Sequence, residues 1–125
     1  MTGQLEIRFQ NIGGCLIVRA AGEADATSAP LLRDQLIGQL SLGEASVIID
    51  LSRVTTADST GLSAVLAAGH EARASGGTLR VAGARPAWRR VLRATDPAAV
   101  LVLHDDVTDA LEAAIEDAQA SRSAR

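Results

Sequence analysis

The residues best suited to chemistry form one short run, Asp58-Ser59-Thr60-Gly61-Leu62. The Asp58 carboxylate can cap a helix that begins at Ser59, and Gly61 lets backbone or a partner approach closely. The free N–H groups and the dipole of a helix start favour negative charge. The Ser59 hydroxyl is therefore well suited to carry a phosphate. Ordinary helix capping also explains why Asp58, Ser59 and Thr60 stand at a helix start. The spacing therefore leaves open whether these residues only cap the helix or also carry a phosphate.

Other reactive residues are few and scattered. The two histidines, His70 and His104, have no ligand spacing with the single cysteine, Cys15, so the sequence does not favour a zinc site. His70 would lie about three helical turns from Ser59, too far for a catalytic hydrogen bond, and the chain has no Gly-x-Ser-x-Gly motif. Cys15 is expected to be a small core residue.

Charged residues gather in two places. Arg85, Arg89, Arg90 and Arg93 fall within one short segment, and the last helical segment carries six acids. Those acids are Asp105, Asp106, Asp109, Glu112, Glu116 and Asp117. Solvated helix faces explain both groups, and a second contact surface is the sharper alternative.

The composition excludes several classes of function. The chain has 125 residues, 47% of them hydrophobic, yet only one Phe, one Trp and no Tyr, so the core must be aliphatic and no base-stacking platform exists. A net charge of −3 gives no basic field for nucleic acid or an acidic membrane. No lysine is present to complete a phosphate-binding Walker motif. No signal peptide and no apolar run of about 18 residues is visible, so a cytoplasmic protein is expected.

The hydrophobic pattern predicts the elements that position the run at Ser59. Strands are expected over 5–10, 15–20, 47–51, 78–82 and 100–103, with a turn at 11–14 and loops at 22–26 and 52–57. Helices are expected from a Thr27 or Ser28 cap to Gly43, from Asp58 to Gly76-Gly77, from Pro86 through Trp88, Val91 and Leu92, and along a stripe over 107–118.

The predicted order, β-β-α-β-α-β-α-β-α, indicates an α/β fold. An opening antiparallel hairpin should continue into βα crossovers, giving one mixed sheet of about five strands with about four helices packed against it. The continuous apolar strand over 47–51 should lie at the sheet centre. We expect a single domain over 1–125, with a core of about 5–118 and a flexible tail over 119–125.

The segment from Ile48 to Leu62, with its hydrophobic-Asp-Leu strand followed by Asp-Ser-Thr-Gly-Leu, resembles the signature of the STAS domain, the sulfate-transporter and anti-sigma-antagonist module. Gly22-Glu23-Ala24-Asp25 resembles the family's Gly-Glu-Leu-Asp loop, and the resemblance runs from about Leu5 to Ile115. The sequence departs from the family pattern at Ala24, at Ser63 and at Asp96-Pro97.

The resemblance implies a bacterial anti-sigma factor antagonist with the STAS fold and no catalytic activity of its own. By position, Ser59 is then the phosphorylation site, and Asp25, Asp58, Thr60, Gly61 and Leu62 form the partner-binding switch. The implied partners are an anti-sigma factor that is also a serine kinase, and a phosphatase that resets the switch.

The resemblance also implies what the protein lacks. No cofactor or metal is expected, since ATP and Mg²⁺ would belong to the kinase, and the free protein should be a monomer. Two other functions remain open within the family: an accessory subunit of a transport ATPase, and a scaffold or ligand-sensing module that does not switch.

Overall fold

The computed structural model describes residues 4–42 and 46–123. Five strands and four helices alternate there as the sequence predicts, which confirms the α/β fold. The elements are β1 (Leu5–Ile12), β2 (Cys15–Ala24), α1 (Ala29–Ser41), β3 (Ser46–Ala57), α2 (Ser59–Ala74), β4 (Thr78–Ala82), α3 (Pro86–Thr95), β5 (Leu101–His104) and α4 (Val107–Ser123).

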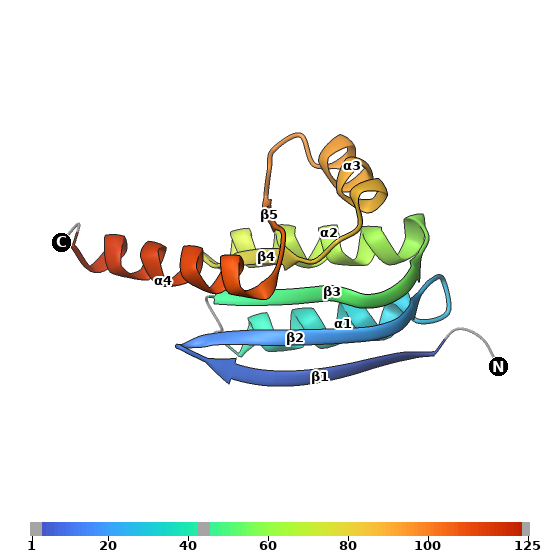
Figure 1. Ribbon diagram of the computed structural model, residues 1–125, viewed down its shortest axis with the longest axis horizontal. Helices are drawn as coiled ribbons and strands as arrows, with labels where there is room; N and C mark the ends of the chain where they lie inside the picture. The colour runs from blue at the N-terminus through green and yellow to red at the C-terminus, as the bar shows by residue number, and fades with distance from the viewer. Residues whose placement is uncertain (1–3, 43–45, 124–125) are drawn as a thin grey trace.

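The strands form one mixed sheet in the order β1-β2-β3-β4-β5 (Figure 1). Strands β1 and β2 pair antiparallel, and each later pair is parallel. Gly13 and Gly14 make the tight turn of the hairpin with φ angles of 58° and 81°, a left-handed conformation that glycine adopts without strain. Residues 47–51 are buried because β3 lies at the centre of the sheet.

The two faces of the sheet carry cores of unequal size. Helices α1, α2 and α3 cover one face, where Leu32, Leu36 and Val65 are at most 1% exposed. The opposite face holds a smaller cluster beneath α4, which includes Ile17 and Ile48. Both cores are almost entirely aliphatic, as the composition requires.

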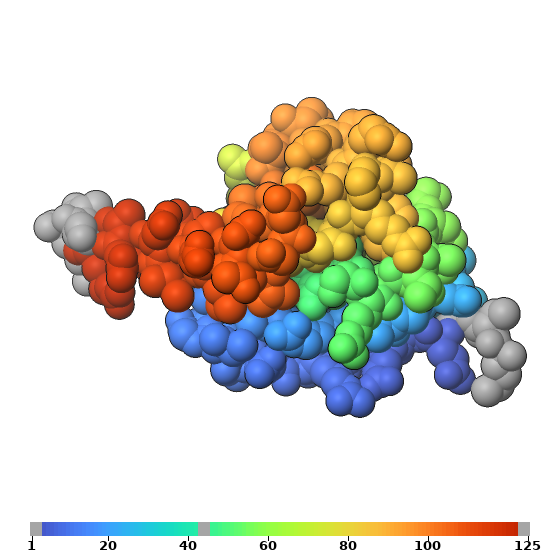
Figure 2. Space-filling view, viewed as in Figure 1, coloured from blue at the N-terminus to red at the C-terminus, as the bar shows by residue number. Residues whose placement is uncertain are grey.

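Helix α4 extends past the ends of the strands as an arm (Figures 1 and 2). Ala110 and Ala114 are buried against the sheet, whereas Ile115 is 40% exposed and Ala118 is exposed. The predicted stripe therefore packs over only part of its length, because the helix is longer than the surface beneath it. Val91, predicted on the inner side of α3, is also exposed, at 41%.

Strands β2 and β3 are longer than predicted. The expected loop over 22–26 begins only after Ala24, and the expected connection over 52–57 is a strand that ends at Ala57. Backbone pairing of 22–24 with 54–57 continues the ladder through two register shifts. The segment over 52–57 could not be recognised as a strand from the sequence, because its side chains are mostly polar and exposed. The ladder there depends on backbone hydrogen bonds. The extension carries both strands to the start of α2.

Other boundaries also differ from the prediction. Strand β1 continues to Ile12, so the turn expected over 11–14 is confined to 13–14, because pairing with β2 extends through Asn11 and Ile12. Helix α1 ends at Ser41, and Gly43, its predicted stop, lies outside the described residues. Strand β5 begins at Leu101 rather than Val100, and α4 continues through 119–123, where a tail was expected; residues 124–125 lie outside the described part. Among the helices in the described ranges, none combines the length and the apolar character that crossing a bilayer requires.

Candidate functional site

Asp58 caps α2, as its sequence position predicts. Its backbone is extended, with φ −94° and ψ −178°, and its Oδ1 accepts the N–H of Gly61 at 2.9 Å. Its own N–H donates to the carbonyl of Ala24 at 3.1 Å. A carboxylate at this position satisfies a helix N–H and complements the positive end of the helix dipole. Asp58 therefore fixes both the start of α2 and the contact of α2 with β2.

Ser59 and Thr60 form the exposed first turn of α2. The first helical hydrogen bond is that from the Leu62 N–H to the Asp58 carbonyl, at 3.0 Å. The N–H groups of Asp58 and Gly61 have partners, whereas those of Ser59 and Thr60 have none within residues 4–42 and 46–123. An exposed hydroxyl next to unpaired N–H groups at a helix start is accessible to a modifying enzyme, and the helix tolerates added negative charge there.

Gly61 and Leu62 lie beneath this turn rather than on the surface. A Cβ on Gly61 would lie 2.1 Å from the carbonyl oxygen of Ala24, so α2 and the end of β2 touch through backbone. Leu62 is 5% exposed and belongs to the larger core. Both residues position the exposed turn, and their burial keeps them from forming a surface themselves.

Asp25 organises the turn between β2 and α1. Its Oδ1 accepts the N–H groups of Thr27 and Ser28 at 2.9 and 3.1 Å. Ser28 Oγ accepts the Asp25 N–H at 3.0 Å and donates to the Glu23 carbonyl at 2.6 Å. Ser28, one of the two predicted caps, stands at the N-cap position of α1, but its side chain bonds within this turn and accepts no helix N–H. Asp25 follows Ala24, whose carbonyl binds Asp58, so the two aspartates lie at one end of the sheet (Figure 1).

A hollow between α1 and α2 brings Pro30 and Arg33, which the sequence did not indicate as site residues, next to the predicted Thr60. Pro30 and Arg33 line it from α1, and Thr60, Ser63 and Ala67 line it from α2. Arg33 is exposed and forms no ion pair within the described ranges. The spacing of Pro30 and Arg33 places them on one helix face, but only the packing of α1 against α2 shows which face meets Thr60.

The remaining reactive residues lie elsewhere. Cys15 is buried beneath α4, and His70 is exposed on α2. His104 on β5 has a lowered pKa because of partial burial, and the charge of Arg80 lowers it further. Arg80 Nη1 lies 3.1 Å from His104 Nε2, and Arg80 Nη2 pairs with Asp117 Oδ2. In the described residues, no three His, Cys, Asp or Glu side chains cluster as a metal site would require.

The arginine cluster is partly paired. Arg85 lies over the Trp88 ring at 5.0 Å, and Arg89 Nη1 bonds Asp105 Oδ1 at 2.7 Å. Arg90 and Arg93 are exposed and have no acidic partner in the part of the chain that the structure describes. Half of the cluster is therefore structural, and half faces solvent.

Comparison with protein families matches residues 6–110 to the STAS domain. Among curated protein sequences, no relative reaches a significant match. The match covers most of the chain and includes all the predicted switch residues.

Solved structures that include anti-sigma factor antagonists share the fold. One from Mycobacterium paratuberculosis is 27% identical, with a TM-score of 0.72 over 90% of this chain and 97% of that one. A serine-to-glutamate variant of RsbS from Moorella thermoacetica is 15% identical, with a TM-score of 0.76 over 90% and 97%. The phosphorylated Bacillus cell-fate determinant SpoIIAA is 18% identical, with a TM-score of 0.69 over 87% and 99%.

Proposed function

Because the chain belongs to the STAS domain family, we propose that it is an anti-sigma factor antagonist switched by phosphorylation of Ser59. Its unphosphorylated form binds an anti-sigma factor that is also a serine kinase, and this binding frees a sigma factor. The observation that carries the proposal is the exposed Ser59 hydroxyl at the capped start of α2. The likeness to anti-sigma factor antagonists, one of them solved in a phosphorylated form, supports it.

The modification is a phosphoryl transfer from ATP that the kinase binds together with Mg²⁺. The Ser59 hydroxyl oxygen forms a bond to the γ-phosphorus, the bond from that phosphorus to the β-γ bridging oxygen breaks, and ADP leaves. A base on the kinase takes the hydroxyl proton. This chain contributes an accessible acceptor and has no turnover of its own. A phosphatase hydrolyses the ester and restores the binding form.

The added charge is what ends the complex. A phosphoserine carries roughly −1.5 to −2 charges at neutral pH, and it arrives next to Asp58, one residue along the chain. Within the free protein, the unpaired N–H groups at Ser59 and Thr60 stabilise that charge. Across a docked partner surface, repulsion and desolvation oppose it. A difference of about 2–3 kcal/mol lowers affinity roughly 30–150-fold.

The residues around Ser59 have two roles in binding: some contact the partner, and others hold α2 in place. Asp25, Asp58 and Thr60 present polar groups to the partner, and Arg33 adds a cation at the edge of the hollow beside Thr60. Gly61 and Leu62 hold α2 against β2, so the surface is rigid before the partner arrives. We expect the protein to act as a monomer in the cytoplasm, without cofactor, metal, nucleic acid or membrane.

The proposal is tested with wild type, Ser59→Ala and Ser63→Ala. Ser63 is an exposed serine one helical turn beyond Ser59, so Ser63→Ala is a matched control. Each protein is incubated with a candidate kinase, ATP and Mg²⁺, and phosphate is located by mass spectrometry. Calorimetry measures kinase binding before and after the reaction. Wild type and Ser63→Ala should acquire one phosphate on Ser59 and lose affinity, whereas Ser59→Ala should stay unmodified and bound.

Two results would count against this function. Phosphate on Thr60 in Ser59→Ala would contradict the assignment of Ser59 as the phosphorylation site. Undiminished kinase binding by the phosphorylated protein would contradict the proposed switch. Stable capture of a transport ATPase without any kinase binding would favour the accessory-subunit alternative instead.

A further inference from the structure

Strand β5 leaves one side of its backbone open. Within residues 4–42 and 46–123 it is the last strand of the sheet, and it pairs with β4 alone. The carbonyl of His104 accepts the Gly83 N–H at 3.2 Å, so the backbone groups of His104 turn toward β4. Because successive residues of a strand turn their backbone groups to opposite sides, those of Leu103 and Leu101 turn outward.

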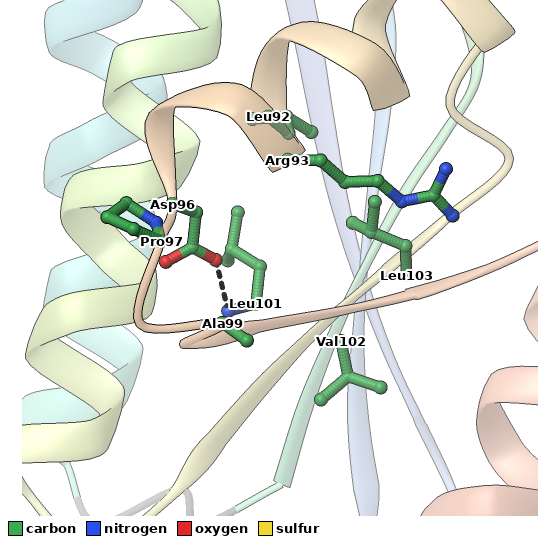
Figure 3. A pocket seen from close by; sticks show the side chains of 8 residues that line it. All are labelled: Leu92, Arg93, Asp96, Pro97, Ala99, Leu101, Val102 and Leu103. Carbon is green, nitrogen blue, oxygen red and sulfur yellow. Dashed lines mark hydrogen bonds between the residues drawn. The ribbon is translucent and has the colours of Figure 1, made fainter.

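Asp96 already occupies part of this edge. Its Oδ1 and Oδ2 accept the N–H groups of Val100 and Leu101 at 3.0 and 2.9 Å, as Figure 3 shows for Leu101. The N–H and carbonyl of Leu103 have no such partner within the described residues. An open pair of this kind is a template for an added strand.

A hollow of about 530 Å³ lies next to the open edge, between β5 and α3. Leu92, Pro97, Leu101 and Leu103 supply most of its apolar wall (Figure 3). Alternate side chains of an added strand point to one face of the sheet, so every second side chain of such a strand could enter this hollow. Backbone pairing and an apolar pocket together are the elements of strand addition.

The charged side chains that line the hollow are Arg93 and Asp96. Arg93 lacks an acidic partner in the described part of the chain. The nearby acids are occupied, because Asp96 accepts two backbone N–H groups and Asp105 pairs with Arg89. A second copy paired edge to edge through β5 would offer each unpaired Arg93 another arginine rather than a carboxylate. An acidic occupant complements the charge.

We propose that the β5 edge and this hollow bind an extended segment of a partner protein in which apolar residues alternate with acidic ones. The segment adds as a further strand: it pairs with Leu103, places apolar side chains in the hollow and sets a carboxylate near Arg93. This surface is separate from the turn at Ser59, so it lets the protein hold a second protein in either phosphorylation state.

The test uses the synthetic peptide acetyl-Glu-Val-Glu-Val-Glu-Val-amide and isotope-labelled protein. Amide exchange is followed by NMR as the peptide is added. At about nine times the Kd, the Leu103 amide should exchange about tenfold more slowly, whereas the Val102 and His104 amides, already paired with β4, should change little. A peptide of the same sequence with N-methylated backbone amides should not bind, because it cannot complete the ladder.

Protein variants test the charge and the edge. Arg93→Glu should weaken binding at least about tenfold, whereas Arg122→Glu, an exposed arginine near the end of α4, should bind like wild type. Leu103→Pro removes an outward N–H from the backbone, together with one apolar side chain of the hollow, and should abolish binding. If Leu103→Pro fails to fold, Arg93→Glu and the methylated peptide still decide the question.

Several results would overturn the inference. Absence of binding up to about 1 mM peptide, a limit equivalent to about −4.1 kcal/mol, is one. Equal binding of the methylated peptide, or of Arg93→Glu, is another. Concentration-dependent dimerisation that itself protects Leu103, measured by sedimentation without peptide, would assign the edge to a second copy of this chain.

Discussion

At the scale of single residues, Gly61 sets how closely α2 approaches β2. A Cβ there would lie 2.1 Å from the Ala24 carbonyl oxygen and 2.7 Å from the carbonyl carbon. These are backbone atoms, so no side-chain rotation relieves the overlap. We expect Gly61→Ala to destabilise the fold by about 1–3 kcal/mol, measured by urea unfolding.

Gly38 provides the matched control for this prediction. It also lies within a helix, and a Cβ there would have no neighbour within 4 Å. Gly38→Ala should therefore stabilise the protein by about 0.5–1 kcal/mol, since alanine is the better helix former. Equal shifts in the two variants would mean that the contact with Ala24 is not what requires glycine.

At the scale of elements, Asp96 determines where β5 begins. Asp96 is 7% exposed, and its side chain accepts two backbone N–H groups. Asp96→Ala leaves those donors unpaired in a buried place, so unfolding free energy should fall by about 1–3 kcal/mol. Asp105→Ala removes an exposed ion pair with Arg89 and should cost no more than about 1 kcal/mol. If the two variants unfold at the same urea concentration, Asp96 has no special role.

The packing of α4 and β5 around His104 predicts a pH dependence. Burial and the charge of Arg80 lower the pKa of His104 from its ordinary 6.5. As the pH falls, His104 is therefore protonated in the unfolded chain before it is protonated in the folded protein. The contribution of neutral His104 to the free energy of unfolding is fully present above about pH 6.5. It decreases as the pH falls below that value, until the pH has passed the pKa of His104 in the folded protein. The groups that act on His104 are Arg80, Asp109, Arg89 and Asp105, in decreasing order.

The measurement compares urea unfolding between about pH 7.5 and 5, the range in which histidine titrates. His104→Gln should lose less stability than wild type as the pH falls, because glutamine does not titrate. His70→Gln, at an exposed position, should keep the wild-type slope. A wild-type slope in His104→Gln would refute the assignment.

Periodicity predicted which elements form but not how far they extend. Alternating and continuous apolar residues located all five strands, and β4 has its predicted bounds. The ends of β2 and β3 were missed because Thr56 is held by backbone pairing with Glu23 and the exposed Thr55 by a side-chain hydrogen bond to the Gly22 carbonyl, neither of which leaves an apolar pattern. The exposed end of α4 was missed because a helical stripe does not reveal where the sheet beneath it stops.

At the scale of the whole molecule, the candidate site combines a local motif with a tertiary arrangement. The cap at Asp58 and the exposed Ser59 follow from a few adjacent residues, so the sequence predicted them. The hollow with Arg33 depends on how α1 packs against α2, and the burial of Leu62 depends on the core below it. Neither can be derived from spacing along the chain.

The separation of the Ser59 surface from the core predicts that negative charge there spares the fold. Ser59→Asp places a carboxylate at the positive end of α2 and should raise stability by about 0.3–1 kcal/mol at low salt. Ser75→Asp places the same group at the C-terminal cap of the same helix and should lower stability by a similar amount. Both effects should shrink at about 1 M salt, where the screening length is about 3 Å. Urea unfolding at two salt concentrations measures both effects, and kinase binding is measured in parallel.

A switch that works through surface charge requires Ser59→Asp to lose its affinity for the kinase while the protein stays folded. A Ser59→Asp protein that unfolds would instead mean that phosphorylation acts by unfolding the domain.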